Sequence, residues 1–179
     1  MLPQEGRGWF RSRETSRHQS PERSYREYKE LSDLKYAIDQ SAIVTTSDIS
    51  GNITYVNEMA LKIYGYRREE MLGRNHRILN SDVHSREFFK KLWDTILSGE
   101  VWRGEVCNKA KDGALHWLDT TIIPFLDENR KPHHFMSIRK DITEKKNIEE
   151  DLKHEQRKRS TIERLSAVGE MAANIAHEI

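Results

Sequence analysis

The chain has 179 residues, of which 36% are hydrophobic and 33% are charged. This length and composition allow one core of ordinary domain size with helical extensions, and they exclude a second large core. Thirty Lys and Arg residues balance 29 Asp and Glu residues, so the formal charge of +1 gives no indication of a nucleic-acid or anionic-membrane partner.

The number of cysteines, the positions of the histidines and the length of the apolar runs indicate the cellular compartment and whether a metal site is expected. The single cysteine, Cys107, excludes an internal disulfide framework and is typical of a reducing compartment. No apolar run reaches bilayer length, so we expect a cytoplasmic protein without a membrane segment. The eight histidines are scattered, and the adjacent His133 and His134 should point to opposite faces of a strand, so no metal site is expected.

Two segments of different character precede the main domain. Residues 1–24 are rich in Arg, Ser, Glu and Gln, which predicts a disordered leader. Over residues 25–41 the apolar side chains recur at helical spacing. This pattern predicts an amphipathic helix that leads into the domain and pairs with a partner chain.

The main domain is predicted to span residues 42–142 and to begin with a hairpin. Strand candidates at Ala42–Thr46 and Ile53–Val56 are separated by a turn rich in Ser, Asp, Gly and Asn. Short helices at Glu58–Tyr64 and Arg68–Leu72 are each followed by a glycine. The clearest helix runs from Ser85 to Ser98, where aromatic and aliphatic residues share one face.

Three further strands complete the predicted sheet. Trp102–Ala110 and Leu115–Pro124 flank Lys111–Gly113, a hairpin turn in which glycine can adopt a positive φ. A polar turn then leads to a last strand at His133–Lys140. Five strands, with short helices between the second and the third, indicate an α+β fold and not a βαβ series.

A long helix is predicted after the domain, with Thr143 as its N-cap. Residues 143–164 carry a four-three seam with charged members, which predicts a weak coiled-coil linker: Ile148, Leu152, Glu155, Arg159 and Ile162. Residues 165–179 (LSAVGEMAANIAHEI) continue the apolar stripe, with His177 and Glu178 at its edge. A neutral imidazole beside a carboxylate is a usable nucleophile near pH 7, but a solvated surface histidine is the commoner case.

The ordered set of elements resembles the PAS fold over about residues 31–145. The landmarks are ITYVN at Ile53–Asn57, Gly65-Tyr66 with Glu69-Glu70, GRNHRILN at Gly73–Asn80, Trp102–Gly104, Lys111–Gly113 and Asp141-Ile142-Thr143. The resemblance implies a five-stranded antiparallel sheet cupping a small-molecule pocket beneath short helices. It also implies a sensing or interaction role.

The C-terminal residues 165–179 resemble the first helix of the dimerisation and phospho-acceptor domain of sensor histidine kinases, including A-H-E-I at Ala176–Ile179. This resemblance implies that His177 accepts the γ-phosphoryl group of ATP and that Glu178 prepares its ring. It further implies a homodimer served by a histidine-kinase ATP-binding domain and a response regulator. The sequence has no glycine-rich nucleotide loop, so we expect a chain truncated before the ATP-binding domain. The alternative is a stand-alone PAS interaction module with a C-terminal dimerisation helix.

Within the domain, Gly73–Asn80 resembles the flavin-binding segment of light-oxygen-voltage domains. The implied contacts are the ribityl chain for Asn75 and Asn80, a phosphate for Arg77 and the isoalloxazine ring for Asn108. Three departures argue against a photochemical adduct: His76 replaces the reactive cysteine, Leu118 replaces a second ring-contacting asparagine, and Arg139 replaces a switching glutamine.

Flavin-adenine-dinucleotide PAS domains of the aerotaxis-receptor and nitrogen-fixation redox-sensor type are more similar. They share Asn75-His76-Arg77, Leu92-Trp93, Trp102 and the Asn108–Gly113 stretch, which implies FAD near Trp93, with its redox state as the signal. Three alternatives stay open: an empty pocket, another ligand, or haem. Haem is less favoured, because haem-binding PAS domains use a histidine within the long helix and Ser85–Ser98 contains none. Trp93 is also explained as a core residue, and Asn75 and Arg77 as groups that cap a turn or pair with a surface acid.

Overall fold

The computed structural model describes residues 21–177, without the side chains of Pro21, Arg23 and residues 168–177. The chain divides into two units, residues 1–37 and residues 38–179. Helix α1 (Pro21–Ser41) begins earlier than the predicted residue 25, because proline is well tolerated in the first turn of a helix. The predicted leader at residues 1–24 is therefore helical from residue 21, and its remainder lies outside the described residues.

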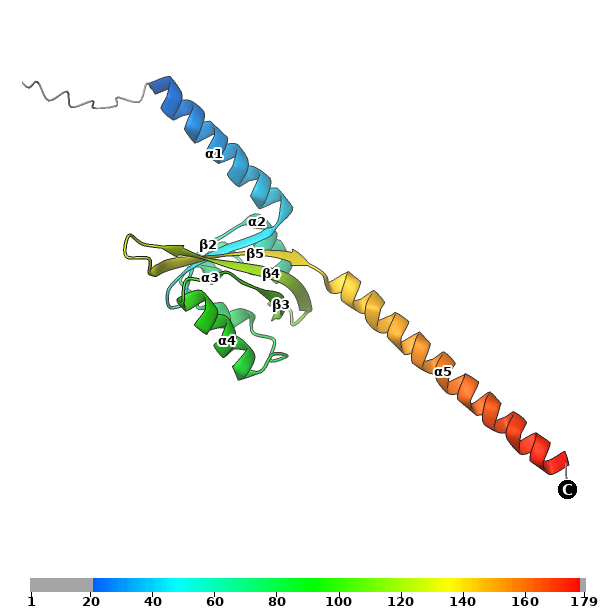
Figure 1. Cartoon of the computed structure of the whole chain (residues 1–179). Coiled ribbons are helices and arrows are strands. Elements are labelled where there is room, and N and C mark those ends of the chain that lie inside the picture. The colour runs from blue at the N-terminus through cyan, green and yellow to red at the C-terminus, as the bar shows by residue number, and fades with distance from the viewer. Residues whose placement is uncertain (1–20, 178–179) are drawn as a thin grey trace, which may run out of the picture. The chain divides into compact units, whose positions relative to one another are not determined.

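Five antiparallel strands form one sheet in the order β2-β1-β5-β4-β3 (Figure 1). Their bounds are β1 Ile43–Asp48, β2 Ile53–Val56, β3 Trp102–Lys109, β4 Leu115–Leu126 and β5 Pro132–Asp141. The predicted fold, a five-stranded antiparallel PAS sheet, is confirmed. The strand furthest along the chain, β5, lies at the centre of the sheet, so its inward-facing side chains are buried in spite of being polar at two positions.

The helices follow the predicted order, with one addition. Helices α2 (Glu58–Tyr64), α3 (Arg68–Met71) and α4 (Arg86–Leu97) match the prediction closely, and Ser85 caps α4 through its side chain. The short 3₁₀ helix η1 (His76–Leu79) was not predicted, because its single turn carries no hydrophobic periodicity. Helix α4 lies against β3, β4 and β5 (Figure 1).

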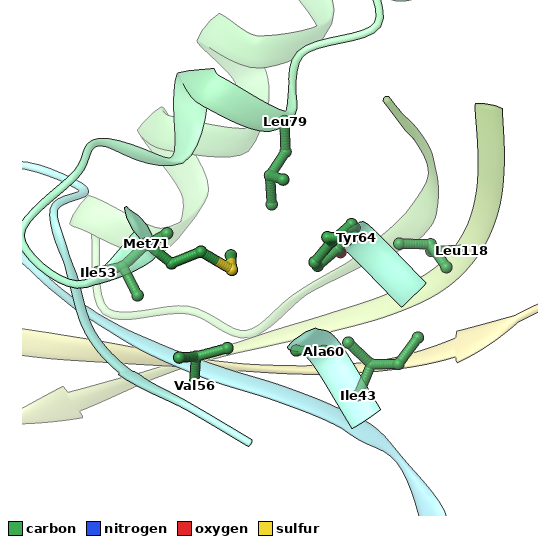
Figure 2. Close-up of a cluster of buried hydrophobic side chains, with 8 residues drawn as sticks. All are labelled: Ile43, Ile53, Val56, Ala60, Tyr64, Met71, Leu79 and Leu118. Carbon is green, nitrogen blue, oxygen red and sulfur yellow. The ribbon is translucent and has the colours of Figure 1, made fainter. Parts of the chain in front are cut away.

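Two buried clusters hold these elements to the sheet. The first joins β1, β2, α2, α3, η1 and β4, and Figure 2 shows its side chains converging: Ile43, Ile53, Val56, Ala60, Tyr64, Met71, Leu79 and Leu118. The second joins α4 to β4 and β5 through Leu92, Ile96, Ile122 and Phe135. Because α4 is held by four apolar side chains and its aromatic neighbours, it can form the wall of a cavity while remaining attached to the sheet.

Helix α5 (Thr143–His177) leaves the end of β5 and is continuous in the structure. Thr143 is its first residue and not its N-cap; the Asp141 carboxylate instead accepts a hydrogen bond from the Thr143 N–H at 2.8 Å. The Thr143 hydroxyl donates to the same carboxylate at 2.5 Å and accepts from the Trp117 N–H at 2.9 Å, which ties β4 to the start of the helix. Among the described helices, none is both long and apolar enough to cross a membrane.

Candidate functional site

A cavity of about 790 Å³ lies between the sheet, η1 and α4. Its floor is formed by side chains of β1, β3, β4 and β5, and its walls by η1, α4 and the turn between β1 and β2. This volume lies within the range of ordinary small-molecule sites. All five residues predicted to contact a cofactor line it: Asn75, Arg77, Asn80, Trp93 and Asn108.

The amide of Asn75 is committed to local structure. Its Nδ2 donates to the Ser50 carbonyl at 2.8 Å, and its Oδ1 accepts from the Arg77 N–H at 3.2 Å as the cap of η1. The capping interpretation of Asn75 is therefore correct for its backbone contacts. By contrast, the Arg77 side chain forms no ion pair with any residue in 21–177, so its guanidinium is available to the cavity.

The two other asparagines differ in how much bonding capacity they retain. Asn80 exchanges hydrogen bonds with Asp82, at 3.1 Å from Nδ2 and 3.2 Å to Oδ1. Asn108 is 9% exposed, accepts from the Tyr64 hydroxyl at 3.0 Å and donates to the Leu79 carbonyl at 3.2 Å. Because a primary amide has two N–H groups and two lone pairs on oxygen, Asn108 retains one donor and one acceptor for a ligand.

Trp93 serves both as core and as cavity wall. Its ring meets Phe135 edge to face, with centroids 5.9 Å apart and an interplanar angle of 82°. On the other side it approaches the β1–β2 turn so closely that a Cβ on Gly51 would lie 3.0 Å from the indole. The indole thus closes the space between α4 and this turn, and only glycine at position 51 permits the approach.

The charges that line the cavity are all positive. Arg77, Arg86, Lys90 and Arg139 contribute to the lining, and no aspartate or glutamate does so. Only Lys90 has a carboxylate partner among the described residues, Asp94 at 2.8 Å. Low-dielectric walls with charges of one sign concentrate the field, so the cavity favours an anionic ligand.

The deepest of these cations is Arg139, whose Nη1 donates to the Thr45 hydroxyl at 2.9 Å. The Nε2 of His76 lies 3.5 Å from the same hydroxyl. Burial, and to a lesser degree the charge of Arg139, lowers the pKa of His76 to about 3, so the imidazole is neutral at physiological pH. Sequence reasoning identified Arg139 only as a departure from a flavin-binding pattern, and His76 as such a departure and as part of the Asn75-His76-Arg77 run; it did not predict the burial of either side chain.

The predicted phospho-acceptor residue lies at the end of α5. His177 is the last residue of α5, its side chain is not among those described, and Glu178 lies outside the described residues. Their roles stay predictions.

The described residues contain no cluster of metal ligands. The reasoning about the paired histidines was nevertheless wrong in detail, because the Nδ1 atoms of His133 and His134 lie 2.9 Å apart and not on opposite faces.

A second hollow, of about 830 Å³, runs along the first turns of α5. It is lined by Trp117 and by acidic and basic side chains of the helix, most of which are exposed. Exposed charges of both signs are well solvated and select no ligand. The cavity beneath α4, with its aromatic wall and charges of one sign, is the better candidate site.

A family model of the PAS domain matches residues 40–144, which is more than half of the chain. This chain belongs to the PAS domain family. The match spans the whole sheet, the cavity and the first residues of α5, so the family assignment covers every element that forms the site.

Among characterised relatives, the PAS region is 30% identical over 118 residues to the nitrogen fixation regulatory protein of Klebsiella pneumoniae, covering 65% of this chain and 24% of that protein. It is 30% identical over 101 residues to the aerotaxis receptor of Escherichia coli K12, covering 56% and 20%. It is 31% identical over 115 residues to the blue-light-activated histidine kinase 1 of Erythrobacter litoralis, covering 64% and 30%. The chain thus spans less than a third of the length of these relatives.

Solved structures agree on the fold. A light-oxygen-voltage domain from an Erythrobacter litoralis blue-light-activated histidine kinase superposes with a TM-score of 0.51 at 27% identity, covering 56% of this chain and 95% of that one. A PAS domain from Colwellia psychrerythraea gives a TM-score of 0.58 at 23% identity, covering 64% and 98%. The second likeness shows the fold alone. The sequence relatives make the domain a homologue of signal-transduction sensors.

Proposed function

We propose that this chain is the sensory input module of a two-component signalling protein, in which the content of the cavity controls helix α5 and, through it, the phosphorylation of His177. The observation that carries the proposal is the cavity itself, with an aromatic wall and only positive charges in its lining. Relatives that are named as a regulatory protein, a receptor and a histidine kinase support a signalling role. A cytoplasmic location is part of the proposal.

FAD is the proposed cofactor, and the residues present fit it. The cavity has the volume and the Trp93 wall that a planar ring requires, and the Arg77 guanidinium suits a phosphate. Asn108 retains a donor and an acceptor for the polar edge of a ring. When bound, a flavin supplies a group that changes charge and hydrogen bonding with its redox state. The described lining contains no cysteine, so it offers no thiol for a photochemical adduct.

Strand β4 offers a route from the cavity to α5. Its residues Thr120 and Ile122 line the cavity, and Trp117 on the same strand contacts the start of the helix. The Trp117 carbonyl accepts from the Ile142 N–H at 2.8 Å, and the Lys146 ammonium lies 5.4 Å from the centre of the indole. A displacement of β4 would therefore be transmitted directly to the first turn of α5.

The proposed partners are a second copy of this chain, a histidine-kinase ATP-binding domain and a response regulator. Four apolar side chains of α5 are more than half exposed in the single chain: Ile148, Leu152, Ile162 and Leu165. A second helix packed against α5 would cover them. The same exposed residues favour the second candidate function, a stand-alone interaction module in which α5 serves only for dimerisation.

The cofactor proposal is tested by the absorption spectrum of the purified chain, followed by acid release and identification of any chromophore. Flavin bands that disappear on reduction and return in air support FAD, and Arg77→Ala should then lower its retention. A colourless protein that stays colourless after refolding with FAD rejects this part of the proposal.

Phosphotransfer separates the two candidate functions. The chain is incubated with a separate histidine-kinase catalytic domain and labelled ATP, beside the variant His177→Gln. Acid-labile label that is lost in the variant supports the signalling role. Absence of label from both proteins supports the stand-alone module.

A further inference from the structure

Arg139 is a buried cation without a carboxylate partner. It lies on the central strand β5, is 7% exposed, and forms no ion pair within the described part of the chain. Its recorded partner is the neutral Thr45 hydroxyl. A guanidinium cannot release its proton in a protein, so it cannot escape the cost of burial by becoming neutral, as a buried lysine does.

No carboxylate forms an ion pair with Arg139 in the described part of the chain; the Asp141 carboxylate, two residues along β5, is engaged by the Thr143 N–H and by His116. The nearest titratable group on the neighbouring η1 helix is His76, which is neutral and carries no negative charge. Burial of an ion is costly unless a counter-charge and hydrogen bonds accompany it. Arg139 also lines the cavity, so an occupant of the cavity can contact its guanidinium. The compensation is therefore expected from whatever occupies the cavity.

Two hydroxyls on the same face of the sheet as Arg139 also line the cavity. Ser137 precedes Arg139 on the same face of β5, and Ser47 lies on the adjacent strand β1. Each is 5% exposed, lines the cavity, and forms no side-chain hydrogen bond with another described residue. No buried side-chain N or O atom of the described residues lacks a hydrogen-bond partner, so these two hydroxyls are accessible from the cavity and are available to a ligand there. One group with several acceptor oxygens would satisfy the guanidinium and both hydroxyls together.

The remaining cations of the lining belong to other elements. Arg77 comes from η1, whereas Arg86 and Lys90 come from α4, so the cavity has one positive centre on its floor and another in its walls. The lining also contains apolar side chains, among them Trp93 and Phe135. The oxidised flavin ring is uncharged, and a flavin with phosphates at the walls would leave Arg139 without a counter-ion.

We propose that the floor of the cavity is an anion subsite, in which Arg139, Ser137 and Ser47 bind the carboxylate of a small aromatic acid whose ring lies against Trp93 and Phe135. The planar fork of arginine matches a carboxylate with two parallel hydrogen bonds, which gives charge selectivity together with orientation. This inference rests on the proposed function only in taking the cavity as the sensory site. It does not require the cofactor to be a flavin.

A matched pair of probes tests the subsite. 2-Naphthoate and 2-naphthamide have the same shape and differ in charge, and each is titrated calorimetrically into the full chain after removal of any bound chromophore. We expect naphthoate to bind at least about tenfold more tightly than naphthamide, since a charge-assisted pair replaces a neutral hydrogen bond. In Arg139→Gln this preference should disappear while the affinity for naphthamide stays within about twofold.

The control is Arg77→Gln, which removes a wall cation and should retain most of the preference for naphthoate. If Arg139→Gln does not fold, Thr45→Val provides a second test, because it removes the hydroxyl that holds the guanidinium and should reduce the preference. Equal affinity of the two probes for the wild-type chain overturns the inference. So does a preference that survives Arg139→Gln, and so does failure of both probes to bind.

The two proposals fail in distinguishable ways. A purified chain that holds FAD but shows no preference between the probes supports the cofactor and refutes the anion subsite. A colourless chain that prefers naphthoate supports the subsite and refutes the flavin. A preference in a flavin-binding chain, measured after flavin removal, supports both and makes the aromatic acid a competitor for the cofactor site.

Discussion

The buried imidazole of His76 should make the stability of the domain strongly dependent on pH. Its pKa is about 3 in the folded protein, compared with 6.5 for an exposed histidine, because burial and the charge of Arg139 disfavour its protonated form. The folded state therefore binds fewer protons than the unfolded state between these two values. The stabilising contribution is complete above pH 6.5 and is lost progressively as the pH falls toward 3.

The size of the effect follows from this difference in proton uptake. Where only the unfolded state is protonated, the free energy of unfolding falls by about 1.4 kcal/mol per pH unit. Because the histidine of the unfolded chain is largely neutral at pH 7 and largely protonated at pH 5, the loss over this interval is about 2 kcal/mol. The variant His76→Gln retains a polar side chain of similar size and removes the titration.

Urea unfolding at pH 7 and pH 5, followed by tryptophan fluorescence, measures the effect. The wild-type chain should lose about 2 kcal/mol more than His76→Gln between the two values. His154→Gln, which replaces an exposed histidine on α5, serves as the control and should match the wild type. Equal pH dependence in the wild type and in His76→Gln would show that His76 is not buried as a neutral group.

Three further changes test other parts of the structure. Gly51→Ala should destabilise the domain by about 2 to 4 kcal/mol and alter the fluorescence of Trp93, because a Cβ would meet the indole at 3.0 Å in a turn with a φ of +81°. Glu70 accepts hydrogen bonds from Lys111 at 2.8 and 2.9 Å, which hold the pKa of the carboxyl at about 2; in Lys111→Met its NMR titration midpoint should rise toward 4.5. Arg139→Met should raise the free energy of unfolding of the ligand-free chain by about 1 kcal/mol or more, measured in urea, because it removes an unpaired buried charge.

Each of these changes has an informative comparison. Gly113→Ala also places a side chain at a positive φ, but its Cβ would meet nothing within 4 Å, so it should cost only the backbone strain of about 1 to 2 kcal/mol. An equal cost at positions 51 and 113 would contradict the contact with the indole. For Glu70, a midpoint unchanged by loss of the lysine would assign the shift to the Arg67 backbone N–H. Destabilisation by Arg139→Met would mean that the guanidinium is already compensated in the ligand-free protein.

Most of the fold was predictable because its elements carry their own local signals. Helix α4 has an apolar face, a serine cap and a following glycine, and its bounds were placed within one residue at each end. The β3–β4 hairpin was marked by its glycine turn. By contrast, η1 is a single turn fixed by backbone bonds and the Asn75 cap, so nothing periodic indicated it. The start of α1 was misplaced because residues 21–24 are polar, although proline suits a first turn.

The cavity residues were predictable only in part, and the reason is physical. Resemblance to flavin-binding PAS domains identified five residues that line the cavity, but it could not show that the Asn75 and Asn80 amides are occupied by local hydrogen bonds. Nor could it reveal the importance of Arg139. Whether an arginine on a strand is solvated or buried without a partner depends on the positions of the other strands. That information is tertiary and has no local signature.

The chain as a whole is almost neutral, but the charges that line the cavity are all positive. A total of +1 argues against binding to large polyanionic surfaces, since such binding depends on an excess of charge over a broad area. A small ligand experiences only the groups that line its site, and here those groups include Arg77, Arg86, Lys90 and Arg139 without any carboxylate. The acidic side chains that balance the total lie elsewhere in the chain. A chain with almost no net charge can therefore still offer a small anionic ligand a site lined by positive charges alone.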